Sequence, residues 1–141
     1  GDVVKLASGY VLQAGATDAP LGVFYGVEYT ATDGEIVFSR KWPSATATLG
    51  SADAKAYVYA DPDIVYEAQY PGTPPQADVG KVHTISTTAG DTNNNRSKEG
   101  VTTTTASGIA KQVAFVDRPD NSIGQYARGL FVFPASVFGN D

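Results

Sequence analysis

The stretch from residue 21 to residue 43, LGVFYGVEYTATDGEIVFSRKWP, restricts the fold of this chain more than any other. Bulky residues alternate in it with small or polar ones, and a strand places the two sets on opposite faces because its side chains repeat every two residues. The alternation is interrupted at Asp33-Gly34, a pair that tolerates the positive φ angles of a two-residue type I′ turn. Pro43 has no amide hydrogen to donate and ends the pattern. We therefore predict a β-hairpin in which Tyr29 lies opposite Phe38.

Short strand patterns recur along the rest of the chain, and no segment keeps the 3.6-residue period of a helix over about ten positions. The turn Asp61-Pro62-Asp63 predicts a second hairpin, because proline fixes φ and aspartate side chains accept hydrogen bonds from nearby backbone amides. Further strands are predicted at residues 2–6, 9–14, 81–86, 109–116 and 128–134.

A polar stretch between residues 87 and 107, TTAGDTNNNRSKEGVTTTTAS, predicts a long connection that is mobile over about residues 88–107. The chain has 141 residues, a length that suits one domain. We predict a single all-β domain covering residues 1–141, which is either an antiparallel β-sandwich or a small β-barrel with long polar loops.

Charge and composition exclude several classes of protein. The net charge is −5 and the basic residues are scattered, whereas a nucleic-acid-binding domain normally carries a basic stripe. Cysteine is absent, which excludes thiol catalysis, and no apolar run approaches the roughly 18 residues of a membrane span. We therefore expect no nucleic-acid or membrane partner. An acidic segment is interpreted as a solvated face; it contains Asp53, Asp61, Asp63, Glu67 and Asp78 against Lys55 alone.

Candidate catalytic groups are few. His83 is the only histidine and has no compelling nucleophile near it in the sequence, so a catalytic triad is left incomplete and a multi-histidine metal centre is excluded. A glycosidase would need two carboxylates facing each other in a cleft, for which the candidates are Glu28, Glu35 and Glu67. Carboxylates on the outer face of a hairpin are common by chance, so we expect no catalytic residue, no enzymatic activity and no cofactor.

The run from Asp91 to Asn95, DTNNN, begins like a calcium-binding loop. An EF-hand loop requires glycine at its sixth position and a bidentate glutamate at its twelfth, and here those positions hold Arg96 and Thr102. The pattern therefore favours a polar loop, and we expect no metal site.

Aromatic residues are the remaining candidates for function, although the core must take some of them. Residues 130–133, LFVF, are apolar on both faces of a predicted strand, so both faces must be covered, and one cover can be another subunit. Trp42 follows Arg40-Lys41 at a strand end, and tryptophan, tyrosine and arginine are favoured at protein interfaces.

The order of these segments resembles the capsid decoration, or cement, proteins of tailed bacteriophages. The resembling pieces are the hairpin GVFYGVEY…W-P, the turn ADPD and the turn VDRPDN near the carboxyl end, and they span nearly the whole chain. The resemblance implies a β-rich protein that binds the outside of an assembled icosahedral shell, often as a trimer at threefold positions. Such proteins usually carry a segment before the strand that begins at Gly1-Asp2, so the resemblance also implies an N-terminal segment ahead of Gly1.

We therefore expect a structural virion protein on the capsid surface, assembled in the host cytoplasm, that bridges major capsid subunits and stabilises the shell. Its expected partners are the major capsid protein and sister copies in a homotrimer. The alternative is a carbohydrate-binding β-sandwich module, which a planar row of exposed aromatic rings would favour. The residues expected to contact the capsid or a sister subunit are Arg40, Lys41, Trp42, Asn93, Asn94, Asn95, Arg96, Lys98, Phe131 and Phe133.

Overall fold

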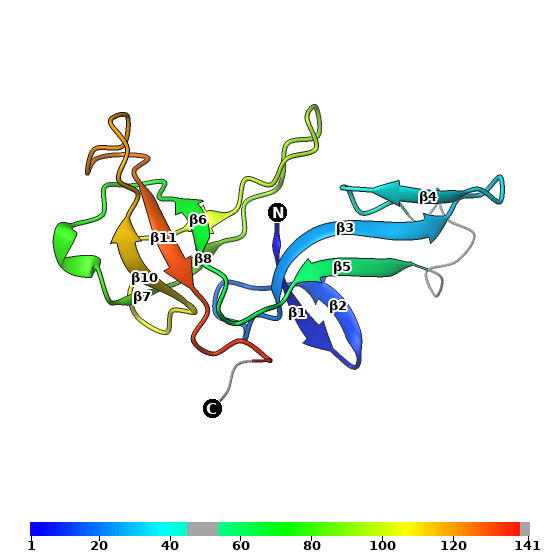
Figure 1. The fold of residues 1–141 in the computed structure, drawn as a ribbon, viewed down its shortest axis with the longest axis horizontal. Helices are drawn as coiled ribbons and strands as arrows, with labels where there is room; N and C mark the ends of the chain where they lie inside the picture. The colour runs from blue at the N-terminus through cyan, green and yellow to red at the C-terminus, as the bar shows by residue number, and fades with distance from the viewer. Residues whose placement is uncertain (45–53, 139–141) are drawn as a thin grey trace.

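The computed structural model describes residues 1–44 and 54–138, and these ranges form short antiparallel strands and one 3₁₀ turn (Figure 1). The all-β prediction is thus confirmed. Among the described residues the sheets stay open and do not close into a barrel, which agrees with the sandwich alternative. In the same ranges, no helix is long and apolar enough to cross a membrane. The elements are β1 (Val3–Ala7), β2 (Tyr10–Gln13), β3 (Gly22–Thr30), β4 (Ile36–Ser39), β5 (Lys55–Tyr59), β6 (Tyr66–Gln69), η2 (Gln76–Asp78), β7 (Val82–His83), β8 (Ile85–Ser86), β9 (Gly100–Val101), β10 (Ala110–Phe115) and β11 (Arg128–Val132).

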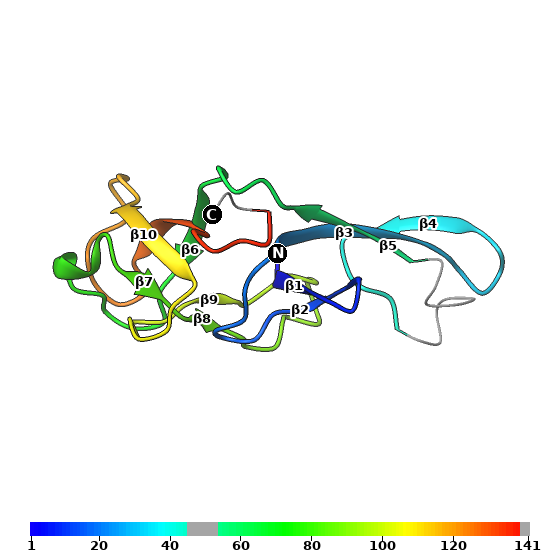
Figure 2. The ribbon, with the colours of Figure 1, turned by 90° about the horizontal axis from the view of Figure 1, so that it is seen from below.

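The long strand β3 organises the first sheet, whose order is β2-β1-β3-β4 with β5 also paired to β3. β5 pairs with residues 23–28 of β3, a stretch that overlaps the partners of both β1 and β4. A strand has only two edges, so β1 and β4 share the edge opposite β5. Figures 1 and 2 show the outer part of β3 with β4 and β5 projecting away from the remaining strands. We call this three-stranded projection the arm.

The hairpin of β3 and β4 forms as predicted, but its turn and register differ by one residue. Gly34 alone has a positive φ, of 90°, and its amide donates to the Ala31 carbonyl. This is a three-residue loop that ends in a left-handed glycine, and not the predicted two-residue type I′ turn. Phe38 consequently pairs with Glu28 and not with Tyr29. A shift of one residue moves a side chain to the opposite face of a sheet, so the predicted face of Phe38 is wrong.

The predicted second hairpin does not form. β5 belongs to the first sheet, whereas β6 joins the second sheet, whose order is β6-β11-β10-β7. The segment between them, which contains Asp61-Pro62-Asp63, crosses from the arm to the second sheet (Figure 1). Its turn chemistry was interpreted correctly, because the Asp63 amide donates to Asp61 Oδ1 over 2.9 Å. A turn residue fixes the local bend, but the partner of each strand is chosen by long-range packing.

The core lies where the second sheet meets β8, β9 and the start of β1. Its members are Val3, Ala14, Tyr70, Ile85, Val101, Ile109, Ala110, Phe131 and Phe133. Phe131 is 1% exposed and Phe133 is 6% exposed, so the chain itself covers both side chains. The structure therefore places these two phenylalanines in the core, where almost none of their surface is left for the predicted contact with a sister subunit.

A buried polar network sits within this core. The Tyr70 hydroxyl donates to Gln112 Oε1 over 2.9 Å and lies 3.3 Å from His83 Nε2. His83 Nδ1 lies 3.0 Å from the Thr102 carbonyl, an acceptor, so this ring nitrogen carries the hydrogen. Tyr70, His83 and Gln112 are all completely buried. His83 is thus a packed and hydrogen-bonded residue, and solvent does not reach it.

The polar stretch of residues 88–107 has more structure than an irregular loop. Residues 91 and 96 form an antiparallel bridge, with the Asp91 amide donating to the Arg96 carbonyl over 2.8 Å. The Asn93 amide donates to Asp91 Oδ1, and Asn95 adopts a positive φ of 54°. The stretch then forms β9, which pairs with β8. We call residues 91–96 the polar hairpin.

Glu99 ties the polar stretch to the first sheet. Its Oε2 accepts from the Val3 amide and its Oε1 accepts from Gln13 Nε2, both over 2.6 Å. Burial raises the pKa of the Glu99 carboxyl above its ordinary value of 4.5, and the charge of Asp2 acts in the same direction; the two hydrogen bonds oppose the rise. The carboxylate therefore aligns β1 and β2 at some electrostatic cost.

This raised pKa predicts a pH dependence of stability. Between 4.5 and the raised value the folded protein binds more protons than the unfolded chain, so the free energy of unfolding should fall as pH rises through that window. The variant Glu99→Gln keeps an acceptor for the Val3 amide and should lack this fall. Urea unfolding of both proteins from about pH 4 to pH 7 checks it. The exposed carboxylate control is Glu35→Gln; equal pH profiles for wild type and Glu99→Gln would contradict the prediction.

Candidate interaction surface

Four aromatic rings form a continuous row across one face of the arm. The ring centroids are 5.2 Å apart for Tyr59 and Tyr25, 6.0 Å for Tyr25 and Phe38, and 5.7 Å for Phe38 and Tyr57. Each of the four side chains is between 38% and 50% exposed. Edge contacts between neighbouring rings hold the row in place, and its outer surface faces solvent. We call these four residues the aromatic row.

Two local features of β3 place the row on one face. The pairing of β3 with β5 shifts register between Phe24 and Gly26, which leaves Tyr25 as the extra residue of a bulge. A bulge redirects a side chain, and here Tyr25 joins the face of its cross-strand neighbours. Gly26 lies beneath the Phe38 ring, since a Cβ added to it would come within 2.5 Å of Phe38 Cζ. The glycine therefore lets Phe38 lie flat between Tyr25 and Tyr57.

The chemistry of this face suits protein contacts. The Arg40 guanidinium lies 5.7 Å from the centroid of the Tyr25 ring, and Ile36, at the other end of β4, is 76% exposed. Exposed apolar side chains gathered in one place mark binding surfaces in soluble proteins, and tyrosine and arginine are enriched among residues that dominate binding energy. Neighbouring rings are inclined to one another by 45° to 66°, so the row does not offer a single flat plane.

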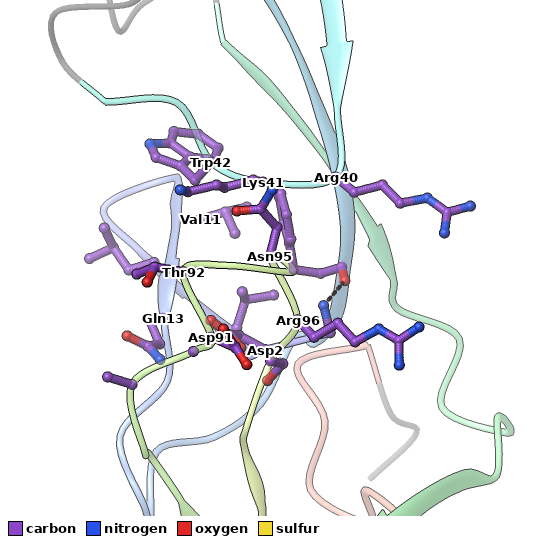
Figure 3. A pocket seen from close by; sticks show the side chains of 17 residues that line it. Asp2, Val11, Gln13, Arg40, Lys41, Trp42, Asp91, Thr92, Asn95 and Arg96 are labelled. Atoms are coloured by element: carbon purple, nitrogen blue, oxygen red, sulfur yellow. Dashed lines mark hydrogen bonds between the residues drawn. The ribbon is translucent and has the colours of Figure 1, made fainter.

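A cavity of about 590 Å³ lies at the base of the arm, on the other side of the sheet from the row. It is lined by the end of β4, the polar hairpin, the first residues of the chain and β2 (Figure 3). Phe24 and Trp42 pack edge to face there with centroids 6.2 Å apart. The side chains of Val4, Val11 and Leu12 complete an apolar wall. Its volume lies within the usual range of binding pockets.

Unpaired basic residues gather around this cavity. Of the basic residues in the described ranges, Lys5, Lys81, Lys98, Arg118 and Arg128 have a carboxylate partner. No ion pair is found there for Arg40, Lys41 or Arg96, and all three line the cavity. Figure 3 shows the side chains of Arg40 and Arg96 pointing to the same side, while Lys41 points to the other with Trp42. Lys55 and Lys111 also lack an ion pair within the described ranges, so three of the five unpaired basic residues there line this cavity.

Two carboxylates also line the cavity, Asp2 and Asp91. Asp91 is committed to its own turn: the hydrogen bond from the Asn93 amide lowers its pKa, and its Oδ2 lies 4.0 Å from Lys98 Nζ. An ionised carboxylate in such a role caps the polar hairpin and does not donate a proton at neutral pH. Among the described residues, no group of three or more metal-ligating side chains is found.

The structure brings together two of the three predicted contact segments. Arg40, Lys41 and Trp42 meet Asn95 and Arg96 around the cavity, although some fifty residues separate them in the sequence. The exposed residues Asn93, Asn94 and Lys98 lie on or beside the polar hairpin but do not line the cavity. The third segment, Phe131 with Phe133, lies in the core.

Sequence reasoning missed the aromatic row as a site. Alternation in residues 21–43 and around Tyr57 predicted that each strand has two distinct faces. The predicted register, however, put Phe38 on the face of Tyr29, and no pattern revealed the bulge at Tyr25. The spacing Tyr57-x-Tyr59 was the available signal, because two tyrosines on one strand face with alanine and valine between them are unusual for a core.

The predicted acidic face is only partly a free surface. Glu67 accepts from Arg118 and Arg128, and Asp78 is buried with Lys81 as its partner, whereas Asp61 and Asp63 are exposed. Asp53 lies outside the described residues.

Comparison with known proteins gives no match: no family model fits the chain, and no curated protein or solved structure is similar to it at a significant level.

Proposed function

We propose that this protein is a structural virion component that binds the outer surface of an icosahedral phage capsid and stabilises the shell by bridging major capsid subunits. The observation that carries the proposal is the aromatic row on a projecting arm, with Arg40 stacked at its edge. A brace needs a rigid body with an exposed apolar contact surface and no reacting groups. The row meets the first requirement because paired strands hold all four rings.

Repetition makes modest contacts sufficient for this function. A shell presents the same binding site many times, and sister copies that associate as a homotrimer would engage several sites together. Linked contacts raise the overall affinity by a factor of about 10² to 10⁴ without any new contact at a single site. The proposed partners are therefore the major capsid protein and sister copies, and the proposed location is the capsid surface.

A carbohydrate-binding module is the second candidate, because exposed tyrosines can stack on sugar rings. The aromatic row is exposed, which favours this alternative. Its rings, however, are inclined by 45° to 66° to one another, whereas a flat sugar surface is best met by coplanar rings. Mutually inclined rings suit the irregular surface of a protein, and this geometry makes the capsid the better-supported partner.

The proposal predicts that truncating the row weakens shell binding. Phe38→Ala and Tyr57→Ala should each weaken binding to empty expanded heads of the cognate phage by about tenfold or more, since a central interface aromatic contributes roughly 1–2 kcal/mol or more. Co-sedimentation with heads measures the affinity, and thermal rupture of the heads measures stabilisation. The matched control is Tyr10→Ala, since Tyr10 is a 72% exposed tyrosine on β2 outside the row.

Three outcomes separate the candidates. Binding that is lost in the row variants and kept in Tyr10→Ala supports the capsid function. Wild-type protein that does not sediment with heads overturns it. Retention of wild type on immobilised polysaccharides, lost in the same row variants, would assign the row to carbohydrate.

A further inference from the structure

An exposed acidic turn joins β5 to β6 and forms no ion pair with the described residues of its own chain. Asp61 Oδ1 accepts from the Asp63 amide over 2.9 Å, and the Ile64 amide donates to the Asp61 carbonyl over 3.3 Å, so the turn has a defined shape. Within the described residues no cation pairs with Asp61 or Asp63. Val65, two residues after Asp63, is 51% exposed. The segment therefore presents two carboxylates beside an apolar side chain, and we call residues 61–65 the acidic turn.

The cavity at the base of the arm has the complementary chemistry. It combines the unpaired cations Lys41 and Arg96 with the apolar wall that contains Phe24 and Trp42; Arg40 also lines it, but its guanidinium lies over the Tyr25 ring of the row. Arginine binds carboxylates through paired hydrogen bonds, and a volume of about 590 Å³ admits a turn of a few residues. None of residues 61–65 lines the cavity of its own chain. The acidic turn and the cavity are thus complementary in charge and polarity, but they lie on different parts of the same chain.

We propose that the acidic turn of one copy docks into the cavity of a second copy. Asp61 and Asp63 would meet the cationic rim, and Val65 would lie against the apolar wall. Opposite charge on the two surfaces favours this pairing and disfavours contact of either surface with itself. The contact is head-to-tail, so each docked copy still presents one free turn or one free cavity, and association continues until a ring closes.

This self-association does not depend on the shell. Its residues differ from the four rings of the aromatic row, and it is measured with the purified protein alone. A failure of head binding leaves it standing, and a failure of self-association leaves the proposed capsid contact of the row standing.

Charge exchange provides the test. One variant carries Lys41→Glu and Arg96→Glu in the cavity; Arg40 is left intact because it contacts Tyr25 of the row. The other carries Asp61→Asn and Asp63→Lys, where asparagine keeps the oxygen that accepts from residue 63. Sedimentation equilibrium over a range of concentrations should show association of wild type, and a dissociation constant at least tenfold higher for each variant. An equimolar mixture of the two variants should associate again, because the acidic turn of one meets the intact cavity of the other.

The controls distinguish docking from a general effect of charge. Lys55→Glu with Lys111→Glu changes the net charge as much as the cavity variant but at two other exposed lysines, and it should associate like wild type. Sodium chloride at about 0.5 M should weaken wild-type association, since it screens the contact. A monomeric wild type at about 0.5 mM, an equal effect of the control variant, or a mixture that stays monomeric would overturn the proposal. A monomeric wild type whose cavity variant loses head binding would instead assign the cavity to the shell.

Discussion

Replacing Phe131 by alanine is expected to lower the free energy of unfolding by about 4 kcal/mol, which corresponds to roughly a thousandfold change in the unfolding constant. The side chain is 1% exposed, and its ring packs against Tyr70 and His83 with centroid distances of 5.6 Å and 6.0 Å. Both neighbours are held by the buried network with Gln112, so they cannot collapse into the space that alanine leaves. The cost therefore includes the lost burial and a residual cavity.

Chemical denaturation of Phe131→Ala and wild type measures this loss, with near-ultraviolet circular dichroism to report on the packing of the tyrosines. Phe38→Ala is the matched control, because Phe38 is 50% exposed and its loss should cost less than about 1 kcal/mol. The two variants should behave in opposite ways: Phe131→Ala loses stability, whereas Phe38→Ala loses binding. If Phe131→Ala kept full stability but changed the oligomeric state, our placement of Phe131 in the core would be wrong.

Gly22→Ala is expected to cost about 3 kcal/mol, because β3 and β5 approach each other too closely there for any side chain. A Cβ on residue 22 would overlap the carbonyl oxygen of Tyr59, and it would lie 2.8 Å from the Tyr59 carbonyl carbon and 3.0 Å from the Ala60 Cα. All three atoms belong to the backbone, so no rotation of a side chain relieves the overlap. The two strands must separate, and Tyr59 would leave the aromatic row.

This substitution should therefore reduce both the thermal midpoint and the affinity for heads, and thermal unfolding followed by the head-binding assay measures the two effects. The control is Gly124→Ala, since Gly124 has no atom within 4 Å of an added Cβ and no positive φ. That variant should unfold within about 0.5 kcal/mol of wild type. Equal stability of Gly22→Ala and Gly124→Ala would mean that β3 and β5 are not paired at this point.

Local patterns predicted the strands well and their partners poorly. The segments 2–6 and 9–14 were predicted to be strands, and β1 and β2 form there and pair antiparallel across Ser8-Gly9, both of which have positive φ. Period-two alternation and a turn suffice for such a pair because everything that decides it lies within about a dozen residues. By contrast, segments 55–59 and 66–69 also flank a turn, yet they join different sheets. Pairing with β3 and with β11 outweighs the short connection between the two segments.

In the candidate site too, local patterns selected the residues, whereas long-range contacts brought them together. Arg40, Lys41 and Trp42 were selected because a strand ends there, and Arg96 because the loop around it is polar; both choices used local information. Their meeting around one cavity depends on the path of about fifty intervening residues, which no local pattern encodes. Phe131 and Phe38 illustrate the remaining difficulty. Both are phenylalanines in predicted strands, but one is buried and the other half-exposed, because only the full set of neighbours decides which face is covered.

Side-chain period, turn residues and composition are local quantities, and they were enough to predict an all-β chain of short strands with polar turns and little recognisable chemistry. The pairing of the strands, the register that Gly34 sets in the arm, the bulge that adds Tyr25 to an exposed row, and the meeting of Lys41 with Arg96 around one cavity could be seen only in the folded chain. Each of those results is fixed by contacts between residues far apart in the chain, whose free energy is shared among many neighbours and has no signature at any one position.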